Sequence, residues 1–342
     1  MTKRITSIQV ARRAGVSQST VSRVFSENSP NVAEATRQRV IAAAQELGYR
    51  PNAIGRMMST QQTDTIGIVM ANITSPFYPY VLEKFLQGLQ AIGRRALLFT
   101  ASAHQDVDDI LPLILEHQVD ALIVTSATLS SAMTAECQRA GTPVILFNRR
   151  VENASVSAVC CDNERGGREI ASLLIETGHQ HFAYIAGTAN TSTNRDRQRG
   201  FVTQLQAHGI DDVRIEPAEY SYDASYQATT RLLQSDHAPD AIFCANDIMA
   251  MGAIDAARAC GLSVPDDVSI VGFDDIPMAR WGAYQLTTMS QEVDTMIEKT
   301  IDLMLTKIAA PQSDPVTTFV AGRMQIRASV RGVNTPVPPA DS

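Results

Sequence analysis

The sequence lacks the signals of a membrane protein and of the common enzyme classes. Its 342 residues contain no run of about 18 uncharged apolar residues, and the N-terminus enters a polar stretch rather than an apolar signal core. The GxxxxGK(S/T), HExxH and GxSxG motifs are absent, and none of the six histidines stands at metal-ligand or nucleophile spacing. We therefore expect a cytoplasmic protein without a membrane partner, which is not an enzyme and holds neither a cofactor nor a metal.

Cysteine is sparse, and its pattern does not suggest pairing. The sequence has an odd number of cysteines and no CxxC pair: Cys137, Cys160, Cys161, Cys244 and Cys260. Adjacent residues of a strand point to opposite faces, so Cys160 and Cys161 are poorly placed to bridge each other. We expect reduced thiols in the core rather than a disulfide framework or a zinc site.

Basic residues are outnumbered, and the formal net charge is −7. The imbalance is uneven, because residues 1–62 carry nine basic and three acidic side chains, a net charge of +6, and the remainder carries −13. A basic head attracts phosphates at one end of the molecule, while the acidic remainder repels them. The distribution therefore favours a nucleic-acid partner that the overall charge conceals.

Residues 5–25, ITSIQVARRAGVSQSTVSRVF, have the pattern of two short helices joined by a tight turn. Apolar residues recur at helical spacing on either side of Gly15: Ile8, Ala11 and Ala14 before it, and Val21, Val24 and Phe25 after it. Ser17 precedes the second helix and can cap its N-terminus. The pattern predicts a helix-turn-helix or, alternatively, an ordinary helical hairpin on the surface.

The second helix presents a polar face opposite its apolar one. Gln18, Ser19, Ser22 and Arg23 lie on this face. Amides and hydroxyls can meet base edges in the DNA major groove, and an arginine can bind guanine through two hydrogen bonds. The same residue types are also common on any solvated helix, so the neighbouring segments must decide between the two interpretations.

The neighbouring segments resemble the lactose-repressor/galactose-repressor family of bacterial transcription regulators. The resemblance is carried by ARRAGVS at 11–17, TVSRV at 20–24, ELGYRPNA at 46–53 and IGIV at 66–69, and it continues to about Arg331. It implies a small all-α DNA-binding head over residues 1–50, in which Gln18, Ser19 and Arg23 read bases. Thr20 and Ser22 would then contact phosphates.

Residues 51–64 are expected to form a hinge and linker. A segment this short cannot hold a helix alone, because isolated helices below about 12–15 residues are marginal. The resemblance implies that two such segments pair in the minor groove of DNA, through residues that include Asn52, Ala53, Met57 and Met58. Met58 stands at the position of the inserted wedge, where leucine is usual, and Gly55 stands where alanine is usual. A plain flexible linker is the alternative.

From residue 65 to about 335, short apolar runs alternate with helical stretches. Strands are expected at 66–70, 96–99, 121–124, 144–147, 182–185, 241–244 and 269–273. Helices are expected at 79–92, 107–117, 130–140, 164–177, 197–208, 224–234 and 248–259. This alternation predicts an α/β fold with two lobes built on parallel sheets, like periplasmic binding proteins. The expected lobes are about 65–160 with a returning segment near 290–320, and about 161–289 with 320–335, before a tail at 336–342.

The polar residues after these strands predict a ligand cleft between the lobes, because open α/β sheets bind ligands at the carboxyl ends of their strands. The expected effector-binding residues are Asn72, Phe77, Tyr78, Thr125, Asn148, Arg149, Thr193, Arg197, Tyr220, Asn246 and Asp274. The resemblance supports Asn148, Arg197, Asn246 and Asp274 in particular, and it implies a sugar, nucleobase or similar small effector. Each of these residues alone could instead be a cap or turn residue.

Several arginines stand near the expected cleft: Arg149, Arg150, Arg195 and Arg197. Their planar guanidinium groups match a carboxylate or phosphate, so we hypothesise an anionic sugar derivative as the effector. In the alternative, Arg197 alone faces the ligand, while Arg149 and Arg150 are solvated or paired with acids of the other lobe.

Together these patterns predict a DNA-binding transcriptional regulator, by the family's habit a repressor. It would act as a homodimer on a near-palindromic operator in double-stranded DNA, where it would be associated with the nucleoid. A small effector would change operator affinity, and DNA would change effector affinity by the same factor. The alternative is a cytoplasmic solute-binding receptor without a DNA role. The sequence does not reveal the effector, the direction of its effect or the operator.

Overall fold

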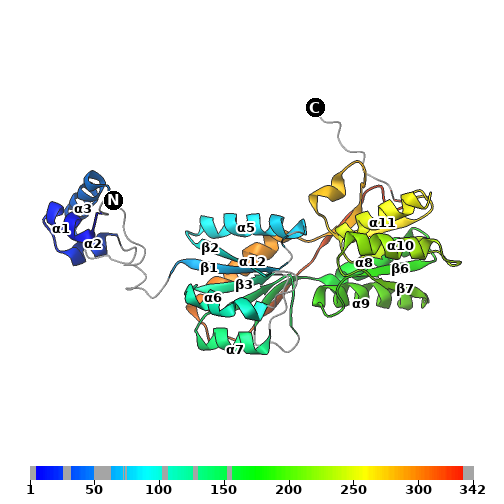
Figure 1. The fold of residues 1–342 in the computed structure, drawn as a ribbon, viewed down its shortest axis with the longest axis horizontal. Coiled ribbons are helices and arrows are strands. Elements are labelled where there is room, and N and C mark those ends of the chain that lie inside the picture. The colour runs from blue at the N-terminus through cyan, green and yellow to red at the C-terminus, as the bar shows by residue number, and fades with distance from the viewer. Residues whose placement is uncertain are drawn as a thin grey trace. The chain divides into compact units, whose positions relative to one another are not determined.

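The computed structural model describes residues 5–25, 32–49, 63–71, 73, 75–101, 107–125, 130–151 and 156–333 (Figure 1). The chain separates into two compact units, Met1–Asp64 and Thr65–Ser342. The first unit is helical, and the second contains two six-stranded sheets.

The described part of the helical unit contains α1 (Ser7–Ala14), α2 (Gln18–Val24) and α3 (Glu34–Leu47). Gly15 ends α1 with φ 66°, and the Ser17 hydroxyl then caps α2 by accepting a hydrogen bond from the Thr20 amide. The three helices share a core that includes Val10, Val21 and Val40. The predicted helix-turn-helix is therefore present.

One residue of the predicted apolar stripe on α1 lies on the wrong side. Ile8 is 55% exposed, whereas Val10, Ala11 and Ala14 are buried. Ile8 is separated from Val10 by about 200° around the helix, so the two side chains cannot both face the core.

The first sheet of the larger unit has the strand order β11-β5-β4-β3-β1-β2, and every pair in it is parallel. We call this sheet with its helices the N-lobe. Its strands are β1 (Thr65–Ala71), β2 (Arg95–Ala101), β3 (Ala121–Thr125), β4 (Val144–Phe147), β5 (Ser157–Cys161) and β11 (Thr317–Val320). Its helical segments are α5 (Phe77–Ala91), η1 (Val107–Ile110), α6 (Leu111–Glu116), α7 (Ser131–Arg139) and α12 (Val293–Ala309).

Helices cover both faces of the N-lobe sheet (Figure 1). Ile66, Ile68 and Met70 of β1 pack in the same cluster as residues of α5 and α12, whereas Val69 packs with residues of α6 and α7. The same alternation separates Cys161 from Cys160, so the two thiols lie on opposite faces as predicted. Burial raises the pKa of each of these two thiols to about 12, which keeps them protonated at neutral pH.

The second sheet, with its helices, forms the C-lobe and has the order β12-β10-β9-β8-β6-β7. Its strands are β6 (Phe182–Ala186), β7 (Val213–Pro217), β8 (Ala241–Cys244), β9 (Ser269–Asp274), β10 (Thr287–Ser290) and β12 (Arg323–Gln325), of which β12 is antiparallel. Its helical segments are α8 (Asn163–Glu176), α9 (Ser192–Ala207), α10 (Tyr222–Leu233), α11 (Asp247–Ala259) and η2 (Pro277–Arg280). A Cβ on Gly200 of α9 would lie 2.0 Å from the Glu164 carbonyl oxygen of α8, so only glycine allows these helices to approach so closely.

The chain passes between the lobes three times, after β5, after β10 and after β11. The predicted α/β fold class with two parallel sheets is confirmed, but several predicted boundaries are wrong. The helix predicted at 197–208 begins at Ser192, because Thr191 caps it by accepting from the Asn194 amide. The helix predicted at 107–117 is η1 followed by α6, and the cysteine predicted in the core at position 260 is only half-buried.

Candidate functional site

The polar face of α2 is exposed, as the sequence predicted. Gln18, Ser19, Ser22 and Arg23 are exposed and Thr20 is half-buried, while Val21 and Val24 turn into the head core. Gln18 Nε2 donates to Ser7 Oγ on α1 at 3.3 Å, which orients the amide against the neighbouring helix. The face therefore offers hydroxyl, amide and guanidinium groups to an external partner. The predicted hinge residues Asn52, Ala53, Met57 and Met58 lie outside the described residues.

A narrow cavity lies between the lobes at the carboxyl ends of the strands. It is lined by Ser75, Phe77, Tyr78, Asn148, Arg149, Thr193, Arg197, Tyr220, Asn246 and Asp274. Loops and helix starts that follow β1, β4, β6, β7, β8 and β9 carry these residues, which is where open α/β sheets place their ligand sites. The free space is about 30 Å³, enough for roughly two waters, so the lobes or side chains must move to admit a sugar.

Arg197 of α9 is the most constrained side chain in the cavity, at 2% exposed. Its Nε donates to Asn163 Oδ1 at 2.8 Å, and its Nη1 donates to the Ala245 carbonyl. Its Nη2 lies 3.3 Å from Asp274 Oδ1, and the guanidinium stacks 3.6 Å from the centre of the Phe273 ring. The orientation of the guanidinium is therefore fixed before any ligand binds.

Asp274 at the end of β9 is the acidic partner of Arg197. Its Oδ1 also accepts from Gln291 Nε2 at 2.7 Å, and its backbone has φ 116°, a conformation that side chains rarely adopt. Burial raises the pKa of Asp274, while the guanidinium of Arg197 opposes that rise. Strained backbone of this kind is concentrated at binding sites.

The other C-lobe residues are held by short-range hydrogen bonds. The Tyr220 hydroxyl shares a hydrogen bond of 3.0 Å with Thr193 Oγ1, and the Tyr220 ring lies over Gly187, where any Cβ would clash with it. Asn246 caps α11 by accepting from the Met249 amide at 3.1 Å. Asn246 is therefore both a cap and a cavity residue, which unites the two interpretations of the sequence.

The N-lobe residues of the cavity have polar atoms without hydrogen-bond partners in the described structure. Asn148 has φ 64° and is 4% exposed, and its Oδ1 has no hydrogen-bond partner in the described structure. Arg149 is half-buried and lines the cavity, and its Nε also lacks a partner there. The Arg150 Nε also lacks a partner there, but the Arg150 guanidinium crosses to the C-lobe, where its Nη2 donates to both carboxylate oxygens of Asp196 at 3.2 and 3.0 Å.

One predicted effector residue, Thr125, is not among the residues that line the cavity. Thr125 is fully buried, and its hydroxyl donates to the Val69 carbonyl at 3.3 Å, so this side chain is used within the N-lobe sheet. Asn72 lies outside the described residues. Ser75 lines the cavity although it is not among the expected effector residues. Three further residues position Arg197 and Asp274 and are not predicted from the sequence: Asn163, Phe273 and Gln291. No motif marks these three, because each acts on a partner that is distant along the chain.

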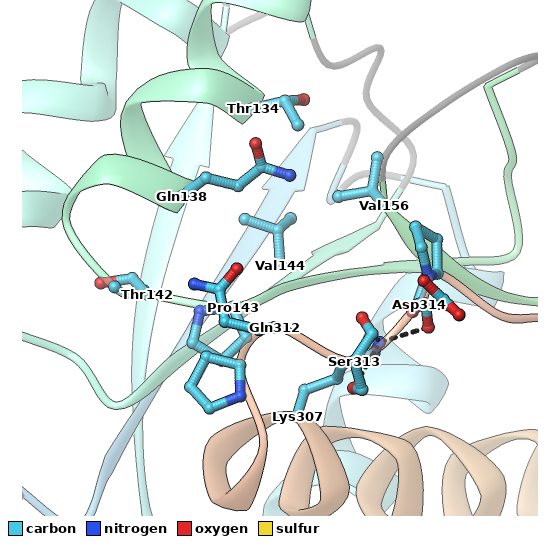
Figure 2. A pocket seen from close by; sticks show the side chains of 14 residues that line it. Thr134, Gln138, Thr142, Pro143, Val144, Val156, Lys307, Gln312, Ser313 and Asp314 are labelled. Atoms are coloured by element: carbon cyan, nitrogen blue, oxygen red, sulfur yellow. Dashed lines mark hydrogen bonds between the residues drawn. The ribbon is translucent and has the colours of Figure 1, made fainter.

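A second cavity lies at the amino ends of β4 and β5, away from the strand ends that carry the polar residues (Figure 2). Its one lysine, Lys307 of α12, points toward the loop that contains Ser313 and Asp314 (Figure 2). Lys307 Nζ donates to the Ser313 carbonyl, Ser313 Oγ and the Asp314 carbonyl at 2.6–2.9 Å. All three donors are used, so Lys307 ties the loop to the helix and offers no free charge to a ligand.

The described residues also show neither a metal site nor a membrane-spanning helix. They contain no cluster of three or more histidine, cysteine or acidic residues that could hold a metal ion. None of the helices described is both long and apolar enough to cross a lipid bilayer.

A helix-turn-helix head joined to a two-lobed body with a narrow polar cavity defines a class of ligand-binding regulatory proteins. Residues 8–52 match the model of bacterial regulatory proteins of the lacI family, and residues 171–330 match the periplasmic binding protein-like domain. Catabolite control protein A of Priestia megaterium is 32% identical over 295 residues, which cover 84% of this chain and 87% of that protein. The chain therefore belongs to the lacI family.

Two further relatives agree with this assignment. The HTH-type transcriptional repressor PurR of Yersinia enterocolitica is 30% identical over 328 residues, covering 94% of this chain and 95% of that protein. The structure of a complex of the transcriptional regulator CelR with cellobiose matches with a TM-score of 0.72 and 29% identity, over 95% of this chain and 100% of that one.

Proposed function

We propose that this protein is a transcriptional repressor whose affinity for operator DNA is controlled by a sugar effector in the cavity between the lobes. The observation that carries the proposal is the presence, in one chain, of an exposed polar helix face and a narrow polar cavity. The proposal is supported by the relatives, of which one is named a transcriptional repressor and another is a regulator in complex with cellobiose.

The DNA-reading surface is the exposed face of α2. Gln18, Ser19 and Arg23 would contact base edges, and Thr20 and Ser22 would contact phosphates. Residues 1–50 would form the reading head and residues 51–64 the hinge. In that hinge Asn52, Ala53 and Met57 would line the minor groove and Met58 would insert between base steps.

The effector would be held mainly by the C-lobe. The carbonyl, carboxylate and amide oxygens near Arg197, Asp274 and Asn246 accept hydrogen bonds, while the guanidinium and the hydroxyl of Thr193 donate them. This mixture suits the hydroxyl groups of a sugar. Phe77 and Tyr78 of α5, whose rings meet edge to face 5.4 Å apart, would cover its apolar side.

A homodimer is proposed from the exposed apolar surface of the N-lobe. Tyr80, Leu86 and Ile92 on or directly after α5, and Leu98 on the edge strand β2, are 37–41% exposed. A second copy would cover these side chains and bring two reading heads to one operator, as two-fold symmetry requires. The protein would then act in the cytoplasm, associated with the nucleoid, without catalysing a reaction.

Selection of binding sites from a random DNA library tests the DNA half of the proposal. The full chain is expected to enrich a near-palindromic sequence, and Arg23→Ala is expected to relax base choice at one position in each half-site. Met58→Gly is expected to weaken binding to the selected operator without changing its sequence. Enrichment of no sequence above non-specific DNA would contradict the proposed function and favour a solute-binding receptor.

A further inference from the structure

The charges that line the cavity do not balance. Arg149, Arg197 and Asp274 are the charged residues among those that line it. Arg197 is paired with Asp274, and its other nitrogens donate to Asn163 and to the Ala245 carbonyl. The positive charge of Arg149 therefore remains without an acidic partner among the described residues.

Arg150 does not share the position of Arg149, although the two are adjacent. The Arg150 guanidinium is bound to both oxygens of Asp196, and its amide donates to Ser192 Oγ at 3.1 Å. Arg150 also lies outside the residues that line the cavity. Its charge is thus offset by the C-lobe, which leaves Arg149 as the candidate for a ligand contact.

The neighbouring polar atoms point to the same place. The Nε of Arg149 and the Oδ1 of Asn148 are both buried without a hydrogen-bond partner in the described structure, and Asn148 is 4% exposed. A buried polar atom without a partner is unfavourable, so these two atoms require one acceptor and one donor from a ligand. Both residues line the cavity, so one small molecule can supply both groups.

The geometry points to an acidic effector. We propose that the effector is a sugar derivative with one carboxylate or phosphate group, which Arg149 binds, and that a hydroxyl of the same molecule donates to Asn148. The inference rests on the proposed function, in which this cavity holds the effector. A guanidinium matches either anion through paired hydrogen bonds, whereas a neutral sugar would leave the Arg149 charge uncompensated when the cavity closes.

Calorimetry on the full chain tests the inference with matched ligand series. Each series contains a neutral hexose, its aldonic and uronic acids and its 6-phosphate: for example glucose, gluconate, glucuronate and glucose 6-phosphate. One acid or phosphate is expected to bind at least roughly 30-fold more tightly than its neutral parent. The ligand that binds most tightly shows whether the site prefers a carboxylate or a phosphate.

Variants assign the effect to Arg149. Arg149→Gln is expected to abolish the preference for the anion, so that the acid or phosphate binds no more tightly than its neutral parent. Arg149→Lys should keep part of the preference for the anion, because lysine keeps the positive charge but cannot form the paired hydrogen bonds of a guanidinium. Arg139→Gln, on the exposed surface of α7 in the same lobe, is the matched control and should leave all affinities unchanged.

The outcomes separate this inference from the proposed function. In one outcome, a neutral sugar binds as tightly as its acid or more tightly, with binding lost in Asp274→Ala but retained in Arg149→Gln. That result would contradict the anionic effector and keep the cavity as the sugar site. Preference for an anion that survives Arg149→Gln would also overturn the assignment. Binding that survives both Asp274→Ala and Arg149→Gln, or no binding in any series, would overturn the proposed sugar site and the anion with it.

Discussion

The two lobes contribute to the same cavity in different ways. On the C-lobe side, Arg197, Asp274 and Tyr220 are held by hydrogen bonds within their own lobe. On the N-lobe side, Asn148 and Arg149 present polar atoms that lack partners in the described structure. Apart from Gln291 Oε1, which also lacks a partner there, the C-lobe side is therefore preformed, whereas the N-lobe side has polar atoms that a ligand would satisfy. An effector that bound both lobes would favour their approach, because it would supply hydrogen-bond partners to the N-lobe groups that otherwise lack them.

The largest expected contrast is between two arginines of the cavity. Arg197→Ala should lower the free energy of unfolding by about 3–5 kcal/mol, because it leaves Asp274 buried without its cation. Arg149→Ala should change it by less than about 0.5 kcal/mol, since it removes no ion pair that the structure describes. Urea unfolding followed by circular dichroism measures both. A similar loss in the two variants would break the comparison between the lobes.

A smaller effect is expected at the ion pair that joins the lobes. Arg150→Ala should lower stability by about 1–2 kcal/mol, because Asp196 then depends on its ion pair with Arg199 of the same helix. Small-angle scattering should also show a larger radius of gyration, since the N-lobe is less firmly held to α9. Arg165→Ala, which removes an exposed pair within α8, is the control and should change neither quantity. An unchanged scattering curve for Arg150→Ala would mean that this pair does not hold the lobes together.

The C-lobe also contains a group that should make its stability depend on pH. His179 is buried, with Nδ1 2.9 Å from the Leu174 carbonyl and Nε2 2.8 Å from Ser269 Oγ, and burial lowers its pKa. Since the folded state binds the proton less readily than the unfolded state, stability is full above about pH 6.5 and falls as the pH drops below it.

Melting temperatures between pH 7.5 and 5.5 test this dependence. His179→Asn should lower stability at pH 7.5 and flatten the part of the profile between pH 6.5 and 5.5. His208→Asn, at an exposed site at the end of α9, provides the comparison and should keep the slope of the unmodified protein. Equal slopes in His179→Asn and the unmodified protein would assign the pH dependence to other groups.

The smallest effect is expected from a single hydroxyl. Tyr220→Phe removes the hydrogen bond to Thr193 but keeps the ring over Gly187, so stability should fall by about 0.5–1.5 kcal/mol. Effector affinity, measured by calorimetry, should fall with it, because Thr193 loses its orientation. Unchanged affinity in Tyr220→Phe would show that the C-lobe surface does not depend on this bond.

The cavity residues that could be predicted from the sequence are those placed by the ends of the parallel strands. Asn148, Asn246 and Asp274 follow buried strands, and parallel strands bring their carboxyl ends to one edge, so their proximity could be anticipated. Thr125 follows the same rule and fails, because its hydroxyl bonds to the neighbouring strand. Pairing of Arg149 and Arg150 with acids of the other lobe is one of the two alternatives from the sequence, and it holds for Arg150. Which of the two arginines would pair could not be anticipated, since it depends on Asp196 of the other lobe.

The three passages of the chain between the lobes have a mechanical consequence. Three covalent connections, after β5, β10 and β11, remove most of the ways in which two bodies can slide or twist against each other. The remaining motion is hinge bending of one lobe against the other about the line on which the connections lie. Any ligand that closes the cavity would therefore select among positions on one path, and its chemistry would decide how far along that path the lobes come to rest.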